Sequence, residues 1–156
     1  MLIILKPYLL SFLLSMLPVT ELRATVPWIM LTYGDNWFGL VVVAIIGNII
    51  PAILILWGLS YVDKIILKRE NIVSRLYDKV IQRTRRKTQL KISTYGYIAL
   101  LLFVAIPLPG TGAWTGSMAA WLFGLSRGRS LLVISLGVVL AAIIMVLISK
   151  GLILSF

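Results

Sequence analysis

The sequence predicts an all-α integral membrane protein with two inverted repeats, each a re-entrant helical hairpin plus a spanning helix, joined by a basic amphipathic cytoplasmic helix. Of the 156 residues, 60% are hydrophobic, and the mean hydropathy of +1.03 is far above that of soluble domains. Ten of the fifteen basic residues lie between Lys64 and Lys91, which leaves long uncharged stretches on both sides. We therefore expect residues 1–156 to form a single transmembrane domain.

Two uncharged segments have the length of a spanning helix. Residues 37–61 and residues 130–154 each contain at least twenty consecutive uncharged positions. Twenty helical residues cover roughly 30 Å, the thickness of the hydrocarbon layer of a bilayer. We expect one spanning helix in each segment.

Two further apolar segments are interrupted and are predicted to turn back within the bilayer. The uncharged residues 92–126 would extend roughly 52 Å as one straight helix. Residues 107–112 (PLPGTG) interrupt them with a sequence that cannot continue an α-helix. This break predicts a hairpin over 95–125, and a comparable break between Pro18 and Pro27 predicts one over 7–34. Four full spans are the alternative, and charge counting does not decide because each arrangement places twelve basic residues inside.

An offset of about ninety residues relates the two halves. It aligns three pairs of helix-breaking residues: Gly34 with Gly124, Gly47 with Gly137, and, within one residue, Pro18 with Pro107. The charged segment between the halves would return the chain to the membrane face that it has just left, so the two repeats would be inverted, as is typical of transporters. Chance alignment of glycines is the alternative interpretation.

Residues 63–91 are predicted to form the basic amphipathic helix on the cytoplasmic surface. Their apolar side chains recur at three- and four-residue spacing, as on one face of a surface helix, and an excess of Lys and Arg marks cytoplasmic loops. This placement argues against nucleic-acid binding as the reason for the net charge of +10. The helix is either an anchor or a surface that binds anionic headgroups or recruits a lipid-phosphate substrate.

The composition removes most enzyme chemistry. The chain has no Cys and no His, and therefore lacks thiolate nucleophiles, imidazole bases and the commonest metal ligands. Five acidic residues remain, and Asp63, Glu70 and Asp78 belong to the charged stretch. We expect no catalytic residue, no metal and no cofactor.

Glu21 and Arg23 are the strongest candidates for a functional site. They follow Pro18, where a broken helix exposes unpaired backbone groups, and ionisable groups at membrane depth are costly and usually functional. Loss of hydration favours the protonated carboxyl, so Glu21 would exchange protons while Arg23 holds an anionic group. At a spacing of two residues, their side chains do not face each other on one helix. The alternative is a pair of interfacial anchors.

The second break carries a glycine-rich loop, PLPGTGAWTG at 107–116. Its glycines let the backbone approach a ligand, and the helix start after Gly112 could receive a phosphate. Close packing of the two hairpin tips is an equal alternative. The candidate residues are Pro107, Pro109, Gly110, Thr111, Gly112, Thr115 and Gly116.

Two smaller groups complete the candidates. Asn48 and Pro51 lie inside the first spanning segment, where Asn48 either lines a pathway or satisfies the carbonyl freed by Pro51. Arg127 and Arg129 follow the second hairpin at an interface, where they bind a phosphate headgroup or serve as anchors.

Three motifs resemble one known family. They are P-x-x-E-L-R at 18–23, G-N-x-x-P at 47–51 and above all PLPGTGAWTG at 107–116. Together they resemble the small multidrug export protein family of prokaryotes, which is distantly similar to the DedA and VTT membrane proteins. The resemblance covers nearly the whole chain and implies a multi-pass protein of the prokaryotic cell membrane. It also implies two re-entrant hairpins and proton-coupled movement of polyprenyl phosphate or phospholipid.

Three functions follow from these observations. The leading one is a lipid-phosphate translocase in which Arg23 and the loop amides hold the headgroup and Glu21 carries a proton. The second is an exporter of small hydrophobic cations that uses Glu21. The third is a non-transporting membrane scaffold that acts through residues 63–91. We expect a homo-oligomer, most simply a dimer, because a lone protomer would leave the hairpin tips exposed to membrane lipids.

Overall fold

The computed structural model describes residues 2–67, 79, 81–83 and 95–155, and these are helical apart from short turns. Within these ranges six α-helices have defined bounds, and a short 3-10 helix, η1 (Gly34–Asn36), precedes the third: α1 (Leu2–Met16), α2 (Glu21–Tyr33), α3 (Trp37–Leu67), α5 (Tyr95–Ala105), α6 (Ala113–Leu122) and α7 (Arg127–Leu154). The all-helical prediction is confirmed for the described residues.

The boundaries of the two long helices differ from the predicted ones. α3 continues past residue 61 and is described as far as Leu67, because residues 62–67 contain no helix breaker. The predicted basic helix at 63–91 therefore loses its first residues to α3, and most of the rest lies outside the described residues. α7 begins at Arg127 rather than at residue 130, directly after the extended residue Ser126.

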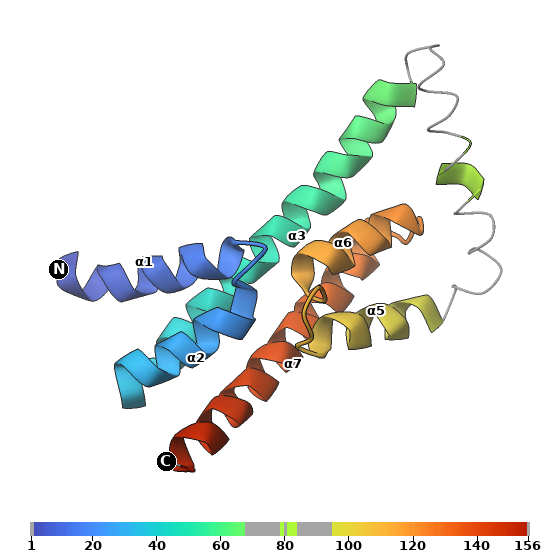
Figure 1. Cartoon of the computed structure of the whole chain (residues 1–156). Helices are drawn as coiled ribbons and strands as arrows, with labels where there is room; N and C mark the ends of the chain where they lie inside the picture. Colours follow the sequence, from blue (N-terminus) through green and yellow to red (C-terminus); the bar gives the residue numbers. More distant parts are fainter. Residues whose placement is uncertain (1, 68–78, 80, 84–94, 156) are drawn as a thin grey trace.

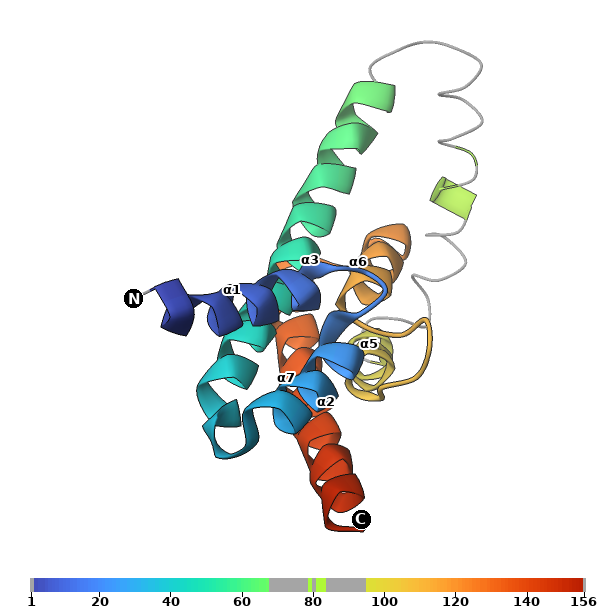
Figure 2. The same cartoon turned by 60° about the vertical axis from the view of Figure 1, so that its left-hand side comes forward.

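Two short helix pairs pack against two long helices that run in opposite directions (Figures 1 and 2). α1 and α2 are joined at residues 17–20, and α5 and α6 at residues 106–112. α1 packs on α3 and α5 packs on α7, while α2 also packs on α7, α6 packs on α3, and the two long helices contact each other. The tips of the two helix pairs consequently lie near the middle of the molecule.

The first tip is a short turn. Thr20 Oγ1 donates a hydrogen bond to the carbonyl oxygen of Leu14, and the Glu21 N–H donates to the carbonyl oxygen of Leu17 at 3.0 Å. These bonds satisfy carbonyls left unpaired at the end of α1.

The prediction that the break extends to Pro27 is wrong, since α2 continues through that residue. The apolar face of α2 is buried against α7 and α3, which offsets the hydrogen bond lost at the proline.

The second tip is organised around the Thr111 hydroxyl. Thr111 Oγ1 lies 2.7 Å from the carbonyl oxygen of Ile106 and 2.8 Å from that of Leu108, and donates to one of them. It also accepts the Leu108 N–H at 3.2 Å. Gly110 and Gly112 have φ values of +81° and +142°, a region that side chains with a Cβ rarely adopt. The glycines therefore let the chain turn, and the threonine ties the turn together.

Close contact between helices depends on two further glycines. A Cβ built on Gly47 of α3 would come within 2.6 Å of the carbonyl oxygen of Phe12 in α1. A Cβ on Gly137 of α7 would come within 2.8 Å of the Val104 Cβ in α5. Neither place has room for a methyl group. Small residues of this kind allow helix backbones to approach each other inside a membrane.

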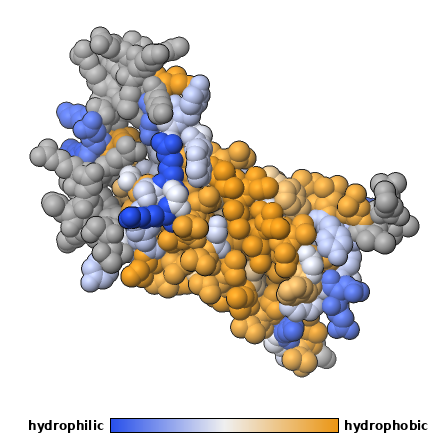
Figure 3. Space-filling view, turned by 180° about the vertical axis from the view of Figure 1, so that it is seen from behind, coloured by the Kyte–Doolittle hydropathy of each residue, from blue (hydrophilic) through white to orange (hydrophobic). Residues whose placement is uncertain are grey.

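Large apolar side chains cover the outside of the molecule. Leu54 on α3 and Leu132 and Leu147 on α7 are 63%, 68% and 65% exposed, and Figure 3 shows a broad apolar belt with polar side chains toward its two ends. Two stretches are long and apolar enough to cross a bilayer: Glu21–Asp63, which includes α2, η1 and most of α3, and Arg127–Leu154. A surface of this kind fits lipid better than water.

Polar and aromatic contacts mark the two ends of the belt. Near the start of α3, the Lys150 Nζ lies 4.9 Å from the centre of the Trp37 ring. Near the end of α3, Trp121 Nε1 donates to Asp63 Oδ2 at 2.9 Å. These two residues line a pocket together with Arg127. The start of α3 and the end of α7 thus share one end of the molecule, and the end of α3 and the start of α7 share the other.

Replacing Gly47 by Ala should destabilise the protein, because the new methyl group must displace the backbone of Phe12, and overpacking of this kind costs about 1–3 kcal/mol. Gly58 on the same helix has open space around it, so Gly58→Ala should be neutral or stabilising by about 0.5–1 kcal/mol. The midpoint of thermal unfolding in detergent measures both. Equal effects would contradict the close packing of α1 on α3.

Candidate functional site

Two hydrogen bonds join the tips of the helix pairs. Trp114 Nε1, at the start of α6, donates to the carbonyl oxygen of Met16 at 3.0 Å. Arg23 Nη2, in the first turn of α2, donates to Thr111 Oγ1 at 2.8 Å. Both bonds connect residues from different halves of the chain, so the tips form one structural unit.

The Glu21 carboxylate is seated against the beginning of α6. A Cβ on Gly112 would collide with both Glu21 carboxylate oxygens, and the Trp114 backbone N–H forms a hydrogen bond to this carboxylate. Gly112 is the N-cap residue of α6 and has no side chain to cap the helix. The first N–H groups of a helix need acceptors and favour negative charge. Glu21 therefore supplies the cap that α6 lacks.

Glu21 also has a strained backbone. Its φ is +41°, and it is the one residue with positive φ other than glycine among the described residues. A residue with a Cβ in this conformation costs of order 1–2 kcal/mol. The side chain is only 6% exposed. A strained backbone and a buried carboxylate at the same residue are typical of functional sites.

Arg23 anchors the second tip through its loop. Its partner Thr111 is itself hydrogen-bonded within the loop. The bond from the guanidinium to Thr111 therefore attaches the whole turn to α2. Side chains two residues apart on a helix point in different directions, so Arg23 does not face Glu21 and instead reaches Thr111. The two charged residues thus contact neighbouring parts of the same loop.

A small central cavity lies between these groups. It is lined by Glu21, Arg23 and Asn48 together with Leu22, Val104, Pro107, Gly112, Ala113, Val138, Ala141 and Met145. Its volume of about 10 Å³ corresponds to a single water molecule. Asn48 is 3% exposed, and its Oδ1 is buried with no hydrogen-bond partner among the described residues. The cavity therefore offers water a place beside the unpaired acceptor and the carboxylate.

The other predicted residues lie at the second tip and the start of α6, on the outer sides of the tips, or in α3. Pro107, Gly112, Thr115 and Gly116 belong to the second tip and the first turn of α6, and Thr115 Oγ1 lies 3.5 Å from the Gly112 carbonyl oxygen. Pro18, Pro109 and Gly110 are exposed on the outer sides of the tips, and Pro51 is buried in α3. The described residues contain no cluster of acidic side chains suited to a metal ion.

Arg127 and Arg129 are not part of the central site. Both are exposed at the start of α7. Arg127 lines a polar pocket of about 200 Å³ at the end of the molecule, together with Ser60, Asp63 and Trp121. Any headgroup bound there would lie away from Glu21.

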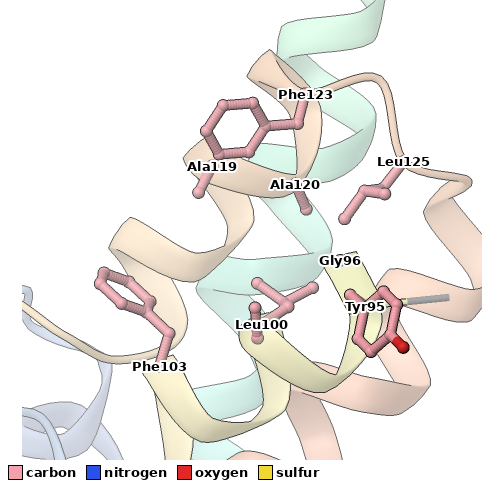
Figure 4. A pocket seen from close by; sticks show the side chains of 9 residues that line it. Tyr95, Gly96, Leu100, Phe103, Ala119, Ala120, Phe123 and Leu125 are labelled. Atoms are coloured by element: carbon pink, nitrogen blue, oxygen red, sulfur yellow. The ribbon is translucent and has the colours of Figure 1, made fainter. Parts of the chain in front are cut away.

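An apolar pocket of about 340 Å³ lies between α5 and α6. Its lining comprises three aromatic residues with small and aliphatic ones: Tyr95, Phe103 and Phe123, with Gly96, Ala99, Leu100, Ala119, Ala120 and Leu125 (Figure 4). Sequence reasoning did not identify this pocket or the role of Trp114. The available signal was the alternation of aromatic and small residues at helical spacing in both segments.

These features define a class of protein: a helical integral membrane protein with a polar site where two helix pairs meet. The family model described as "Putative small multi-drug export protein" matches residues 21–144. The chain therefore belongs to the small multi-drug export family, which confirms the resemblance seen in its motifs. Comparisons with curated proteins and with solved structures find no significant match.

Gly112→Ala should destabilise the protein more than Gly110→Ala. Both substitutions place a Cβ on a residue with positive φ, at a cost of about 1–2 kcal/mol, but only Gly112 also lies against Glu21, whereas Gly110 has open space. The additional loss should be about 1–3 kcal/mol, measured by thermal unfolding. Adding Glu21→Ala should recover part of the loss at Gly112 and none at Gly110. If Glu21→Ala does not rescue Gly112→Ala selectively, the placement of the Glu21 carboxylate against Gly112 is contradicted.

Proposed function

We propose that the protein is a proton-coupled membrane exporter of small amphipathic molecules and that Glu21 takes up and releases the proton. The observation that carries the proposal is a buried carboxylate at the contact between the two tips, inside a helical bundle with an apolar surface. Ionisable side chains at membrane depth are costly and are usually retained for function. Membership of the small multi-drug export family supports small molecules as the cargo.

The same proposal includes two inverted repeats with re-entrant hairpins. In its support, α1 packs on α3 as α5 packs on α7, and α2 packs on α7 as α6 packs on α3. Gly47 and Gly137 each contact the first helix of their own half, and the long helices run in opposite directions. α5 has 11 residues, and about 17 Å of helix reaches only half of the hydrocarbon depth. Transporters built this way bind their cargo where broken helices meet.

Labelling from the two sides of the membrane tests this arrangement. Single cysteines replacing Asp35 and Lys150 should react with an impermeant maleimide from one side, and a cysteine replacing Arg129 should react from the other. The reason is that hairpins return the chain to the face from which it entered. Four full spans would instead expose positions 35 and 129 on the same face. The positive-inside rule predicts that position 129 is cytoplasmic.

The geometry suggests how a proton could change the site. The ionised Glu21 carboxylate accepts a backbone N–H and faces the positive end of α6. Protonation removes this charge and so weakens the hold of the first tip on the second. The Arg23–Thr111 and Trp114–Met16 bonds would keep the tips together until the cargo displaces them. The contact between Glu21 and the start of α6 would thereby couple proton uptake to separation of the tips.

The charge of the cargo separates two versions of the proposal. Glu21 alone would suit a hydrophobic cation, which exchanges with the proton at a shared carboxylate. Arg23 favours the second candidate, a lipid-phosphate translocase, since its guanidinium already binds the loop hydroxyl of Thr111 and is suited to phosphate. Family membership favours the first candidate.

Glu21→Gln should abolish proton-driven transport while retaining the fold. The amide preserves the size of the side chain and its acceptor oxygen, and removes the group that exchanges a proton. The assay is accumulation of ethidium, a small hydrophobic cation, in proteoliposomes with an imposed pH gradient. Asp35→Asn is the matched control, because Asp35 is an exposed acidic residue at the end of the molecule.

Transport that is equal in Glu21→Gln and wild type would contradict the proposal. Movement of fluorescent polyprenyl phosphate but not ethidium, lost in Arg23→Ala, would support the lipid-phosphate candidate. If correctly folded protein moves neither probe, both transport candidates fail and the scaffold function gains support.

A further inference from the structure

Two cavities follow one another along the interface between α5 and α6. The apolar pocket is lined by Leu100 of α5 and Ala120 of α6. The central cavity beside Glu21 is lined by Val104 and Ala113, which lie about one turn further on in α5 and two turns back in α6. Both cavities therefore border the same seam between the two helices.

Val104 lies on this seam one turn from Leu100, and it lines the central cavity but not the apolar pocket. Its Cγ2 would lie 2.6 Å from a Cβ on Gly116 in α6, and its Cβ lies 2.8 Å from the position of a Cβ on Gly137 in α7. The side chain is 2% exposed. Two glycines on two different helices thus make the space that this one side chain occupies, and no other side chain of the described residues contacts both of them at this distance.

We propose that Val104 is the partition between the apolar pocket and the Glu21 cavity, and that the volume of its side chain determines which molecules pass between them. This inference rests on the proposed export function, for which it names a path and a selecting residue. The path runs from the pocket at Leu100, past Gly116, to the carboxylate. Removal of two methyl groups from Val104 would join the two spaces.

The lining of the apolar pocket indicates the chemistry that the path accepts. It presents the rings of Tyr95, Phe103 and Phe123 with small side chains between them (Figure 4), and the described residues contribute no charged side chain to it. Such a wall favours an apolar or aromatic portion of a molecule over a charged one. The charged portion, if present, would be met only at Glu21 and Arg23, beyond the partition.

A purely structural role for Val104 makes a different prediction. As a packing residue, its truncation would loosen the bundle in the same way as truncation of any fully buried valine. Val26 of α2 is 0% exposed and lines neither cavity. Val26→Ala therefore removes the same atoms from the core without joining the two spaces.

The test measures access to the central cavity and does not depend on transport. The chain has no cysteine, so Ala141→Cys introduces a single thiol at the wall of the central cavity. The purified full-length protein in lipid nanodiscs is reacted with N-ethylmaleimide, a small uncharged reagent, and labelling is followed by intact mass spectrometry. Val104→Ala should raise the labelling rate by at least about tenfold, since thiol reactivity depends on access, and Val26→Ala should not.

Two results would overturn the partition. One is a labelling rate that Val104→Ala leaves unchanged; the other is an equal rise in Val26→Ala. If Val104→Ala does not yield monodisperse protein, Val104→Ile replaces it and should slow labelling below that of Ala141→Cys alone, and an unchanged rate then contradicts the proposal. Because no cargo is used, failure here leaves the role of Glu21 standing, and failure of ethidium transport leaves the partition standing.

Discussion

The contact between the Glu21 carboxylate and the first turn of α6 is the interaction on which the arrangement of the two halves depends. A helix that begins in the middle of an apolar bundle has N–H groups that neither water nor lipid can satisfy. The N-cap residue of α6 is Gly112, which has no side chain to offer. Glu21 reaches across from the other half and provides an acceptor. The absence of a side chain at Gly112 leaves room for the Glu21 carboxylate.

Close packing, rather than burial of a large apolar core, holds the helices around this contact. Most large apolar side chains face outward, where the bilayer is their solvent. Inside, Gly47, Gly116 and Gly137 each receive a neighbouring helix at a distance that excludes a methyl group. Helices in lipid gain little from hydrophobic association, so close contact at glycines and the few hydrogen bonds between tips must supply the stability.

The site is asymmetric within the two repeats that we propose. In the proposed repeat, Asn48 of α3 corresponds to Val138 of α7, and both line the central cavity. Glu21 and Arg23 come from the first tip, while the second tip supplies a threonine, a glycine and backbone donors. The first half thus supplies the ionisable side chains, and the second half supplies the groups that they contact. In the function that we propose, a single proton on Glu21 would alter the contact between the two halves.

The sequence by itself determined the bilayer as solvent, the two long apolar helices and the two breaks, and it singled out Glu21 and Arg23 as candidates. These follow from hydropathy, charge placement and proline, which act locally and can be read along the chain. The helical continuation of α2 through Pro27 was not predictable in this way, because burial of the apolar face of α2 against α3 and α7 decided it. Only the tertiary structure placed Glu21 on Gly112, turned Asn48 toward the same cavity and set Val104 between two glycines. These contacts join residues from separate helices, and a pattern along one helix does not specify which side chains of another will meet it.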